Sequence, residues 1–515
     1  MKIIKLLFSR LVIFGLILIV QVFWLFTILF RLSEYSTIIS GLLGVLSILV
    51  TLYIIYKDEN PAYKLAWIVP ILMFPLFGGL LYLAMGNKRP SKQKRREAKN
   101  IQEHPQLQMT QSEEVLERIL KEDPHVYGQV KYIEEIAGFP MYESEYSKYY
   151  KIGEEYYEDL LVELEKAQHF IFMEYFIVAD DDMFGRILEI LERKAKEGLE
   201  VRFMYDDVGS ISMQPFNFRK KIEKLGIQCI AFNPFVPFIS VAMNNRDHRK
   251  ITVIDGHTAF TGGINLADEY INATKKYGHW KDTGIRIRGE AVWNFTVMFL
   301  KMWNLNRPSD KEYSKFRPNL YRHEMMLEPG EEKDSGYVQP YSDTPLDGEI
   351  TGENVYLNII NMATKYVYIF TPYLIIDHEM ITALTLAAKR KVDVRIITPG
   401  IADKKTVYEV TRSYYSILLE AGVKIYEYTP GFLHAKCFVS DDNIATVGTI
   451  NMDYRSLYLH FENAVFLYKT NTVMDVKKDF LETQEKSREI AYETTVKGRA
   501  FSVYLAVLRL FAPLM

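Results

Sequence analysis

Hydrophobic positions follow a different pattern in the first 85 residues than in the rest of the chain. Three apolar runs without a charged residue lie close together: Leu11–Phe30, Ser36–Tyr56 and Leu65–Met85. Each run reaches the roughly 20 residues with which a helix spans the apolar core of a bilayer. No small-residue cleavage site follows the first run, which argues against a removed signal peptide. The pattern predicts a membrane segment of two or three helices, because Pro70 and Gly78 allow the third run to re-enter rather than cross.

Beyond residue 140, short buried runs alternate with amphipathic stretches, and the same order of elements occurs twice. The buried runs Phe170–Ile177 and Tyr366–Tyr373 are each followed by a helical pattern, a short strand and a second helical pattern ending at a glycine. The helices and strands expected after them are Met183–Lys196, Val201–Tyr205 and Phe218–Gly226, then Met380–Lys389, Val394–Ile397 and Thr411–Gly422. This alternation predicts an α/β fold with a mostly parallel sheet in each half.

These patterns divide the chain into an anchor, two similar halves and their connections. We expect a transmembrane anchor over residues 1–86, a basic juxtamembrane linker over 87–140, a first repeat over 141–310, a linker over 311–336, a second repeat over 337–488 and an amphipathic C-terminal segment over 489–515. The last segment sets Arg499 and Arg509 among aromatic and aliphatic residues, which is typical of an interfacial helix or of a helix packed on a domain.

Positive charge gathers directly after the third apolar run. The cluster consists of Lys88, Arg89, Lys92, Lys94, Arg95, Arg96 and Lys99. It outweighs Lys2, Lys5 and Arg10 near the N-terminus, so the positive-inside rule places the following domain on the cytoplasmic side of the membrane. The number of crossings stays open, since three of them would put the two clusters on opposite sides. The cluster also suits an anionic membrane surface, although a solvated linker explains it equally well.

The overall composition excludes some classes of protein. The chain is 25% charged and has a formal net charge of −3, without the basic excess of a nucleic-acid binder. Its two cysteines, Cys229 and Cys437, lie in apolar runs and have no metal-ligand spacing. We therefore expect no nucleic-acid partner, no cofactor and no metal.

The pattern His-x-Lys-x4-Asp occurs once in each half. The two copies are His248, Lys250 and Asp255, then His434, Lys436 and Asp441; each is followed at the same offset by an asparagine, Asn265 or Asn451. Two copies with the same downstream residues are much harder to produce by chance than one short motif. The chain therefore carries two equivalent sites, and the duplicated pattern is a specific sequence signal.

The residue types in this motif suit phosphoryl chemistry. A histidine acts as a nucleophile or as a general acid near neutral pH, and two facing imidazoles divide these roles. Lysine and asparagine donate hydrogen bonds to phosphate oxygens. Because side chains alternate along a strand, each histidine shares a face with the lysine two residues on. Asp255 and Asp441 follow the strands Ile251–Ile254 and Cys437–Val439, so the favoured interpretation is a turn or cap that fixes the loop.

Two further carboxylates are candidates for orienting the imidazoles. Asp282 and Glu462 each follow a motif histidine at a similar distance and precede an apolar strand. The alternative is a surface acid at the start of a strand. Glu174 lies within a buried run and needs a partner, which leaves open whether it faces the cleft. The remaining histidines of interest have no counterpart in the other half and are interpreted as structural: His257, His279 and His460.

The sequence segments around both motifs resemble the phospholipase D superfamily, and the resemblance covers about Tyr149 to Thr483. They are Asn244–Lys250, Gly262–Tyr270, Thr371–Tyr373, Leu433–Lys436 and Val447–Ser456. With the apolar segment, they are similar to bacterial cardiolipin synthases. The resemblance implies two tandem phospholipase D-like α/β repeats that face each other across one active site, in which a carboxylate at the position of Asp282 or Glu462 holds a histidine.

This resemblance also implies an activity. Two phosphatidylglycerol molecules would give cardiolipin and glycerol without a metal, through a phosphohistidine on His248. Water as acceptor would instead make the chain a phospholipase D, and serine or a polyol would make it another transferase. The apolar segment and the lack of basic excess count against an endonuclease of the superfamily, and the completeness of both motifs counts against a catalytically inactive scaffold. The residues 232–239 are apolar and contain two prolines; they form a buried connection or a hydrophobic lip that admits acyl chains. Acyl preference and oligomeric state are not indicated.

Overall fold

The computed structural model describes most of the chain. The described residues are 37–74, 78–86, 91–215, 217–235, 244–320, 331–495 and 499–514, together with residues 23, 24, 27, 31 and 327. The first apolar run therefore lies almost entirely outside the described residues. The same is true of Lys88 and Arg89 of the basic cluster and of the second half of the apolar loop at 232–239.

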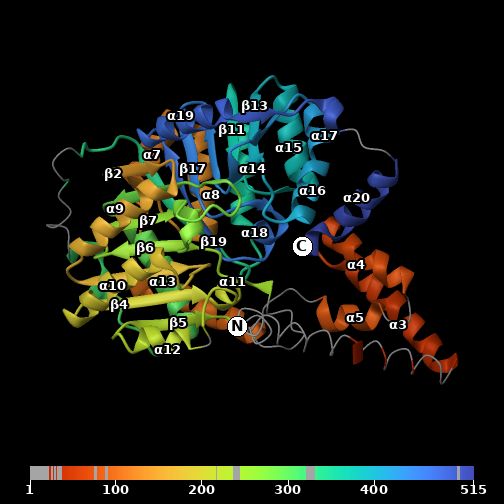
Figure 1. The fold of residues 1–515 in the computed structure, drawn as a ribbon, viewed down its shortest axis with the longest axis horizontal. Coiled ribbons are helices and arrows are strands. Elements are labelled where there is room, and N and C mark those ends of the chain that lie inside the picture. The colour runs from red at the N-terminus through yellow and green to blue at the C-terminus, as the bar shows by residue number, and fades with distance from the viewer. Residues whose placement is uncertain are drawn as a thin grey trace.

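Two mixed β-sheets, one from each half of the chain, form the centre of the fold (Figure 1). The first sheet has the order β2 (Tyr146–Tyr150), β9 (Gly284–Arg288), β7 (Thr258–Gly262), β6 (Lys250–Ile254), β3 (Phe170–Tyr175), β4 (Glu200–Asp206) and β5 (Gln228–Phe232). The second has the order β1 (Tyr142–Glu143), β10 (Tyr337–Asp343), β19 (Glu462–Tyr468), β17 (Ile444–Gly448), β16 (Cys437–Ser440), β11 (Tyr366–Phe370), β13 (Asp393–Pro399), β14 (Lys424–Tyr428) and β20 (Ser487–Glu489).

Only part of each sheet is parallel, so the prediction of mostly parallel sheets was wrong. Parallel pairing joins β3 to β4 and β4 to β5 in the first sheet, and β11 to β13 and β13 to β14 in the second. The motif strands β6 and β16 instead pair antiparallel with β3 and β11 and turn back through hairpins into β7 and β17. The helical patterns that predict crossover connections occur only in the first part of each half. The hairpins after them reverse the chain without a helix.

Helices flank these strands, some of them at the positions that the sequence predicted. In the first half they are α9 (Gly153–Lys166), α10 (Asp182–Lys196), α12 (Phe218–Glu223) and α13 (Val292–Asn306); in the second, α14 (Thr351–Met362), α15 (His378–Lys389), α16 (Lys405–Ser413), α17 (Tyr415–Glu420) and α19 (Thr472–Glu485). The helix expected over Thr411–Gly422 is divided between α16 and α17. α13 is buried along most of its length and contributes to a core shared with residues of the second half, so the two halves pack as one body.

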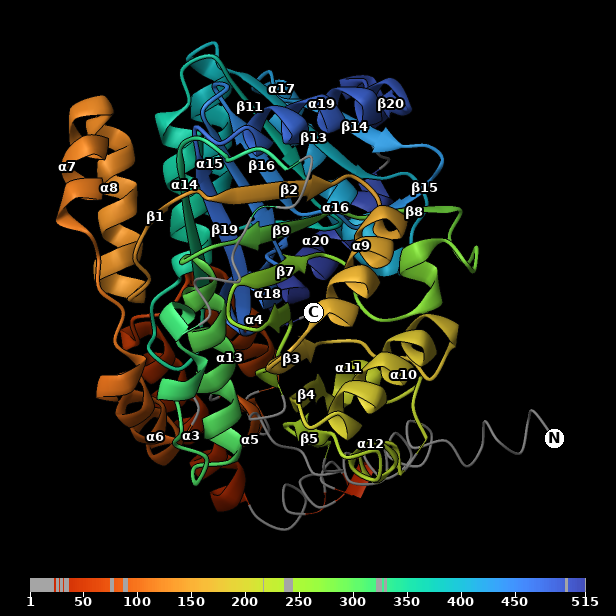
Figure 2. The ribbon, with the colours of Figure 1, turned by 90° about the vertical axis from the view of Figure 1, so that its left-hand side faces the viewer.

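The segment expected to be a linker, residues 87–140, carries several helices in its described part. These are α6 (Lys92–Gln102), α7 (Glu113–Glu122), α8 (Pro124–Tyr132) and a π-helical turn (Ile133–Ala137). Apolar side chains of α7 and α8, such as Ile119 and Val130, are fully buried in the main core. Figure 2 shows both helices at the outer edge, close to β1, which pairs with β10 of the second sheet. This segment is therefore part of the folded domain.

The N-terminal helices extend away from the main body (Figure 1). They are α3 (Thr37–Tyr56), α4 (Pro61–Met73) and α5 (Gly78–Met85), and the C-terminal helix α20 (Arg499–Phe511) returns to contact α4. Arg509 of α20 lies over the ring of Tyr414, and Tyr504 donates a hydrogen bond to Glu409. One face of α20 is thus packed on the domain. Within the described residues, no helix has both the length and the apolarity that crossing a membrane requires.

Candidate active site

Each motif histidine is held by a short pairing with the opposite half of the chain. The backbone N–H of His248 donates to the carbonyl of Phe461 over 3.0 Å, and that of His434 donates to the carbonyl of Lys281 over 2.7 Å. The segment β15 (Gly431–Leu433), which precedes His434, pairs in parallel with β8 (His279–Lys281). Because Glu462 follows Phe461 and Asp282 follows Lys281, each histidine is brought beside the carboxylate of the other half. Sequence order had matched each carboxylate with the histidine that it follows.

His248 forms a two-oxygen contact with Glu462. Its Nδ1 lies 2.9 Å from Oε1 and 3.0 Å from Oε2 of this carboxylate, which also accepts hydrogen bonds from Ser456 and Thr449. Burial raises the pKa of Glu462 to about 8, although Lys250 acts against this rise. Burial and the charge of Lys250 lower the pKa of His248 well below its ordinary value. His248 is therefore neutral and free to act through its other ring nitrogen.

His434 forms a single shorter contact with Asp282. Its Nδ1 lies 2.6 Å from Oδ2, and the other carboxylate oxygen accepts from the backbone N–H of Thr283. Burial acts to raise the pKa of Asp282, but His434 and Lys436 outweigh it, so this pKa is lowered and the carboxylate is ionised. Burial and Lys436 lower the pKa of His434 to about 4, while Asp282 opposes that fall.

The motif lysines lie directly beneath the histidines. Lys250 Nζ donates to the carbonyl oxygen of His248 over 2.5 Å, and Lys436 Nζ donates to that of His434. Both lysines are buried, which lowers the pKa of Lys250 to about 7 and that of Lys436 to about 8. Burial outweighs the effect of Glu462 and Asp282, which act to raise both pKa values. A bound anion would raise the pKa of both lysines and favour their charged forms.

The motif histidines of both halves and the asparagines that follow each motif meet at one cavity of about 580 Å³. His248, His434, Asn265 and Asn451 line it together. Aromatic residues form much of the remaining wall: Phe176, Tyr270, Tyr277, Trp280, Tyr373 and Phe432. Asn265 is held by the backbone N–H of Ile177 and by the hydroxyl of Tyr270. In the described part of the chain, Oδ1 of Asn451 is buried and has no hydrogen-bond partner.

The motif aspartates lie at the far ends of the motif strands, as the cap interpretation requires. Asp255 accepts hydrogen bonds from the backbone N–H groups of residues 168–170, and Asp441 accepts from those of residues 364–366. Both aspartates adopt positive φ angles, of 50° and 51°. Each one ties its hairpin to the start of the neighbouring strand, β3 or β11. Neither is among the described residues that line the cavity.

The structure also separates the other acids and histidines. Glu174 is fully buried and forms an ion pair with Arg249, which also contacts Asp247, so Glu174 does not face the cavity. His257 and His279 bond to Thr258 and Tyr428, in keeping with structural roles.

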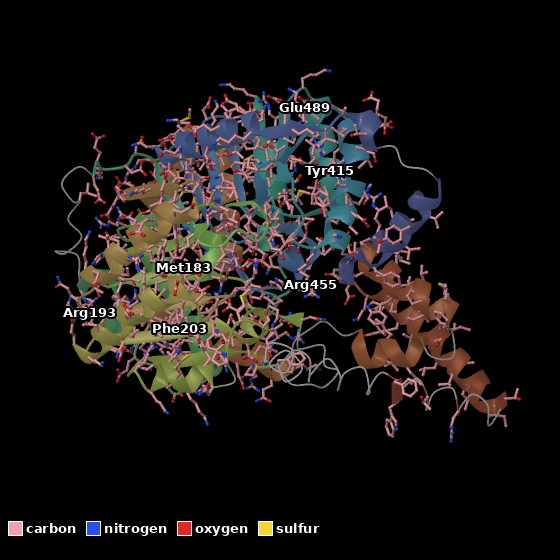
Figure 3. The ribbon with its side chains drawn as sticks, viewed as in Figure 1. Met183, Arg193, Phe203, Tyr415, Arg455 and Glu489 are labelled. Carbon is pink, nitrogen blue, oxygen red and sulfur yellow. The ribbon has the colours of Figure 1, made fainter. Side chains whose placement is uncertain are left out.

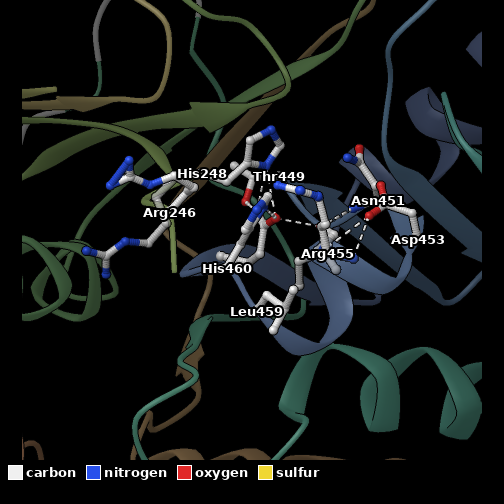
Figure 4. Close-up of polar contacts among 12 residues, drawn as sticks. Arg246, His248, Thr449, Asn451, Asp453, Arg455, Leu459 and His460 are labelled. Atoms are coloured by element: carbon white, nitrogen blue, oxygen red, sulfur yellow. Dashed lines mark hydrogen bonds and ion pairs between the residues drawn. The ribbon is translucent and has the colours of Figure 1, made fainter. Parts of the chain in front are cut away.

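The structural interpretation of His460 was wrong, because this residue lines the cavity. Its ring centroid lies 5.6 Å from that of His248 (Figure 4). Sequence reasoning passed over it for lack of a counterpart in the first half. Its position two residues before Glu462, a candidate for orienting an imidazole, was the signal in the sequence that could have placed it near the site.

Residues that follow the second motif in the chain also line the cavity or hold Glu462, although the sequence analysis assigned them no role. Asp453 and Arg455 line the cavity, and Ser456 and Thr449 hold Glu462. Figure 3 shows Arg455 near the junction of the two halves, and Figure 4 shows it close to His460. These residues belong to the short helix α18 (Tyr454–Tyr458) and to the loop before it.

One cluster in the site has metal-ligand atoms close together, but its surroundings do not suit a cation. Ring nitrogens of His248 and His460 and an oxygen of Glu462 lie within 4.8 Å of one another. Glu462 is already bonded to His248, Ser456 and Thr449, and the positive charges of Lys250, Arg246 and Arg455 act on these imidazoles. The hydrogen-bond donors and positive charges beside these imidazoles fit an anion such as a phosphodiester.

Comparisons with known proteins agree with this arrangement. The family model described as "Cardiolipin synthase, PLD-like domain" matches residues 160–303 and 356–483, and the model "Phospholipase_D-nuclease N-terminal" matches residues 45–87. An uncharacterized protein of Streptococcus mutans is 44% identical over 90% of this chain and 99% of its own. The cardiolipin synthase of Geobacillus kaustophilus is 34% identical, and that of Halalkalibacterium halodurans 35%; each alignment covers 92% of this chain and 94% of the relative.

A solved structure, the phosphatidylserine synthase of Haemophilus influenzae, has the same fold. It superposes with a TM-score of 0.55 at 14% identity and covers 75% of this chain and 98% of its own.

Proposed function

This chain belongs to the cardiolipin synthase family of phospholipase D-like proteins, and we propose that it transfers a phosphatidyl group between two phosphatidylglycerol molecules to give cardiolipin and glycerol. The observation that carries this proposal is the pair of histidines on one cavity, each oriented by a carboxylate of the opposite half. Two equivalent sites that share one cavity can divide attack and proton transfer between them. We assign the repeats to residues 141–310 and 337–488, joined by 311–336.

In the first step, His248 attacks the phosphorus of one phosphatidylglycerol through Nε2. A phosphorus–nitrogen bond forms, the bond to the glycerol headgroup oxygen breaks, and His434 gives its proton to that oxygen. The ionised Asp282 stabilises a protonated His434, whereas Glu462, whose pKa is raised, supports a charge on His248 less well. The negative phosphate raises the pKa of His434 once the lipid is bound. This difference favours His248 as the nucleophile and His434 as the acid.

The second step reverses these transfers with a different alcohol. His434, now neutral, takes the proton from the terminal hydroxyl of a second phosphatidylglycerol as its oxygen attacks phosphorus. The phosphorus–nitrogen bond breaks, cardiolipin forms, and His248 is regenerated. In this mechanism the cationic groups of Lys250 and Lys436 and the amide groups of Asn265 and Asn451 stabilise the charge that develops on the phosphate.

The product of purified protein with labelled phosphatidylglycerol tests this function. We expect cardiolipin and free glycerol in equal amounts. Phosphatidic acid in place of cardiolipin would identify water as the acceptor and overturn the transferase. Formation of a different phospholipid only when serine or a polyol is added would identify another acceptor. Cleavage of a plasmid in the presence of a chelator would support the endonuclease alternative.

We further propose that the N-terminal helices attach the enzyme to a membrane, with the catalytic domain on the cytoplasmic side. Large apolar side chains are exposed along α3 and at the end of α4, including Ile38, Leu42, Leu72 and Met73. A solvent-exposed apolar surface of this extent is typical of a membrane or protein contact. The basic helix α6 follows directly and suits anionic headgroups. Labelling of single cysteines introduced at residues 42 and 94 in intact cells tests both depth and side.

A further inference from the structure

The start of helix α4 makes polar contacts with the loop and helix that carry the second motif. Asn60 caps α4 by accepting a hydrogen bond from the backbone N–H of Ala62. Its amide nitrogen donates to Tyr458 of α18 over 2.8 Å and to Asp377 over 3.0 Å. Tyr458 in turn donates to the same Asp377 oxygen over 2.6 Å. One residue of the N-terminal segment therefore bridges two elements of the second half.

Aromatic packing extends this contact. The ring of Tyr63 meets Tyr454 edge-on at 5.6 Å and Tyr458 at 5.8 Å between centroids. Tyr63 is only 3% exposed, and Ala66, nearly one turn further on, is 1% exposed. Leu65 on the same helix is 54% exposed and so lies on another face. Tyr63 thus packs on α18, and the face of α4 that carries it differs from the exposed face of Leu65.

Helix α18 directly supports the carboxylate of the first catalytic pair. Its Ser456 donates to Glu462 over 2.5 Å and accepts a hydrogen bond from the backbone N–H of Asn451 over 2.8 Å. Arg455 of the same helix lines the cavity. Ala512, beyond α20, also lines the cavity, and its segment contacts both α4 and α18. Both terminal segments of the described chain therefore meet at this short helix.

We propose that Asn60 and Tyr63 are positioning residues, through which α4 holds α18 so that Ser456 meets Glu462 and Glu462 aligns His248. This inference rests on the proposed function. It makes the N-terminal segment a part of the active-site scaffold in addition to an anchor.

The length of α18 gives the physical reason. A helix of five residues is not stable by itself, and Asp453 caps only its first turn. Its outer face, formed by Tyr454 and Tyr458, is held by α4. Without that contact, Ser456 is free to move away from Glu462, and a displacement of about 1 Å can lower the rate by about 10²-fold.

The test uses full-length protein in detergent micelles that contain phosphatidylglycerol, so that membrane attachment does not affect the result. Asn60→Ala and Tyr63→Ala should each lower kcat by at least about tenfold, while KM changes little, because the binding cavity itself is intact. Tyr63→Phe retains the ring and loses the long hydrogen bond of 3.5 Å from its hydroxyl to the carbonyl of Tyr454, so this variant should keep most of the activity. Leu65→Ala, on the exposed face of the same helix, is the matched control and should equal the unmodified protein.

The pH profile separates positioning from simple structural support. The hydrogen bond from Ser456 lowers the pKa of Glu462, among facing groups that include His248, His460, Lys250 and Asp453. Its loss should raise that pKa further and move the part of the kcat/KM profile that follows the ionisation of Glu462 to higher pH in Asn60→Ala, while the fall that the lysines cause stays in place. An unshifted profile, or unchanged kcat in both alanine variants, would overturn the inference. No cardiolipin from the unmodified protein would instead overturn the proposed function.

Discussion

The two histidine–carboxylate pairs have the same motif but different electrostatic surroundings. His434 contacts one oxygen of an ionised Asp282 and is enclosed by the rings of Trp280, Tyr270 and Phe432. His248 contacts both oxygens of Glu462, whose pKa is raised to about 8. A duplicated motif therefore does not imply duplicated roles. A histidine that carries a proton at the start of the reaction is better stabilised beside the ionised carboxylate, and for this reason we propose His434 as the acid.

Loss of either histidine should have the largest effect on the rate of cardiolipin formation. His248→Ala and His434→Ala should each lower cardiolipin formation by about 10²–10⁴-fold or more, since each change removes either the nucleophile or the acid of the proposed mechanism. The measurement is the initial rate with purified protein, and the circular dichroism spectrum is the control for folding. A single variant that keeps more than roughly a tenth of the activity would exclude a shared site.

Covalent trapping tells the two roles apart. In His434→Ala, His248 retains its nucleophilic nitrogen but the second step stalls, so labelled phosphatidylglycerol should leave an acid-labile, base-stable adduct on His248. Mass spectrometry of the peptide locates the label. An adduct on His434 in His248→Ala, with none on His248, would reverse the assignment. Rapid quenching of the unmodified enzyme decides the case in which neither variant is labelled.

The carboxylates should differ in the size of their effects. Asp282→Asn removes the charge that stabilises protonated His434 and should lower kcat by about 10³-fold. Glu462→Gln should cost at least about tenfold less, because Glu462 carries less of its negative charge at neutral pH. Each substitution replaces a carboxylate by an amide of the same shape, so each variant serves as the control for the other. Equal losses would show that the asymmetry between the pairs does not matter in catalysis.

Smaller effects should follow from the two lysines. The pKa of Lys250 is lowered to about 7 and that of Lys436 to about 8, so both ammonium groups are present below these values and are lost as the pH rises. kcat/KM should therefore fall between about pH 7 and pH 9, while kcat falls less because bound phosphate holds the protons on the lysines. Steady-state kinetics across pH 6–9.5 measure both quantities. A profile of kcat/KM that stays flat to pH 9 would contradict this reading.

Removal of divalent cations should have the smallest effect. The cationic and amide donors of the site act on the phosphate without a metal, so excess chelator should leave the rate of cardiolipin formation unchanged. The chelator is compared with an equal ionic strength of inert salt. Complete loss of activity that one divalent ion alone restores would overturn the mechanism.

The sequence by itself determined the class of fold and the duplicated motif, and it named the candidate residues for the chemistry. Periodicity located the main strands and helices, because each pattern reflects local packing of neighbouring residues. It overestimated the parallel part of the sheets, since the hairpins after β6 and β16 carry no helical signal. The sequence analysis also expected a linker over residues 87–140. The run of positive charge at the start of this segment suggested a solvated connection, although the helices that follow it are amphipathic.

Only the tertiary structure decided which groups meet. Glu462 is 214 residues from His248, and Asp282 is 152 residues from His434, so no local pattern could assign these crossed pairs. The place of His460 in the cavity and the contact of Tyr63 with α18 also join residues far apart in the sequence, so no local pattern could predict them. Such contacts depend on how two sheets and a distant helix pack together, and packing is set by the whole buried surface. The sequence named the chemical groups, and the packing of the two halves decided which carboxylate each histidine meets.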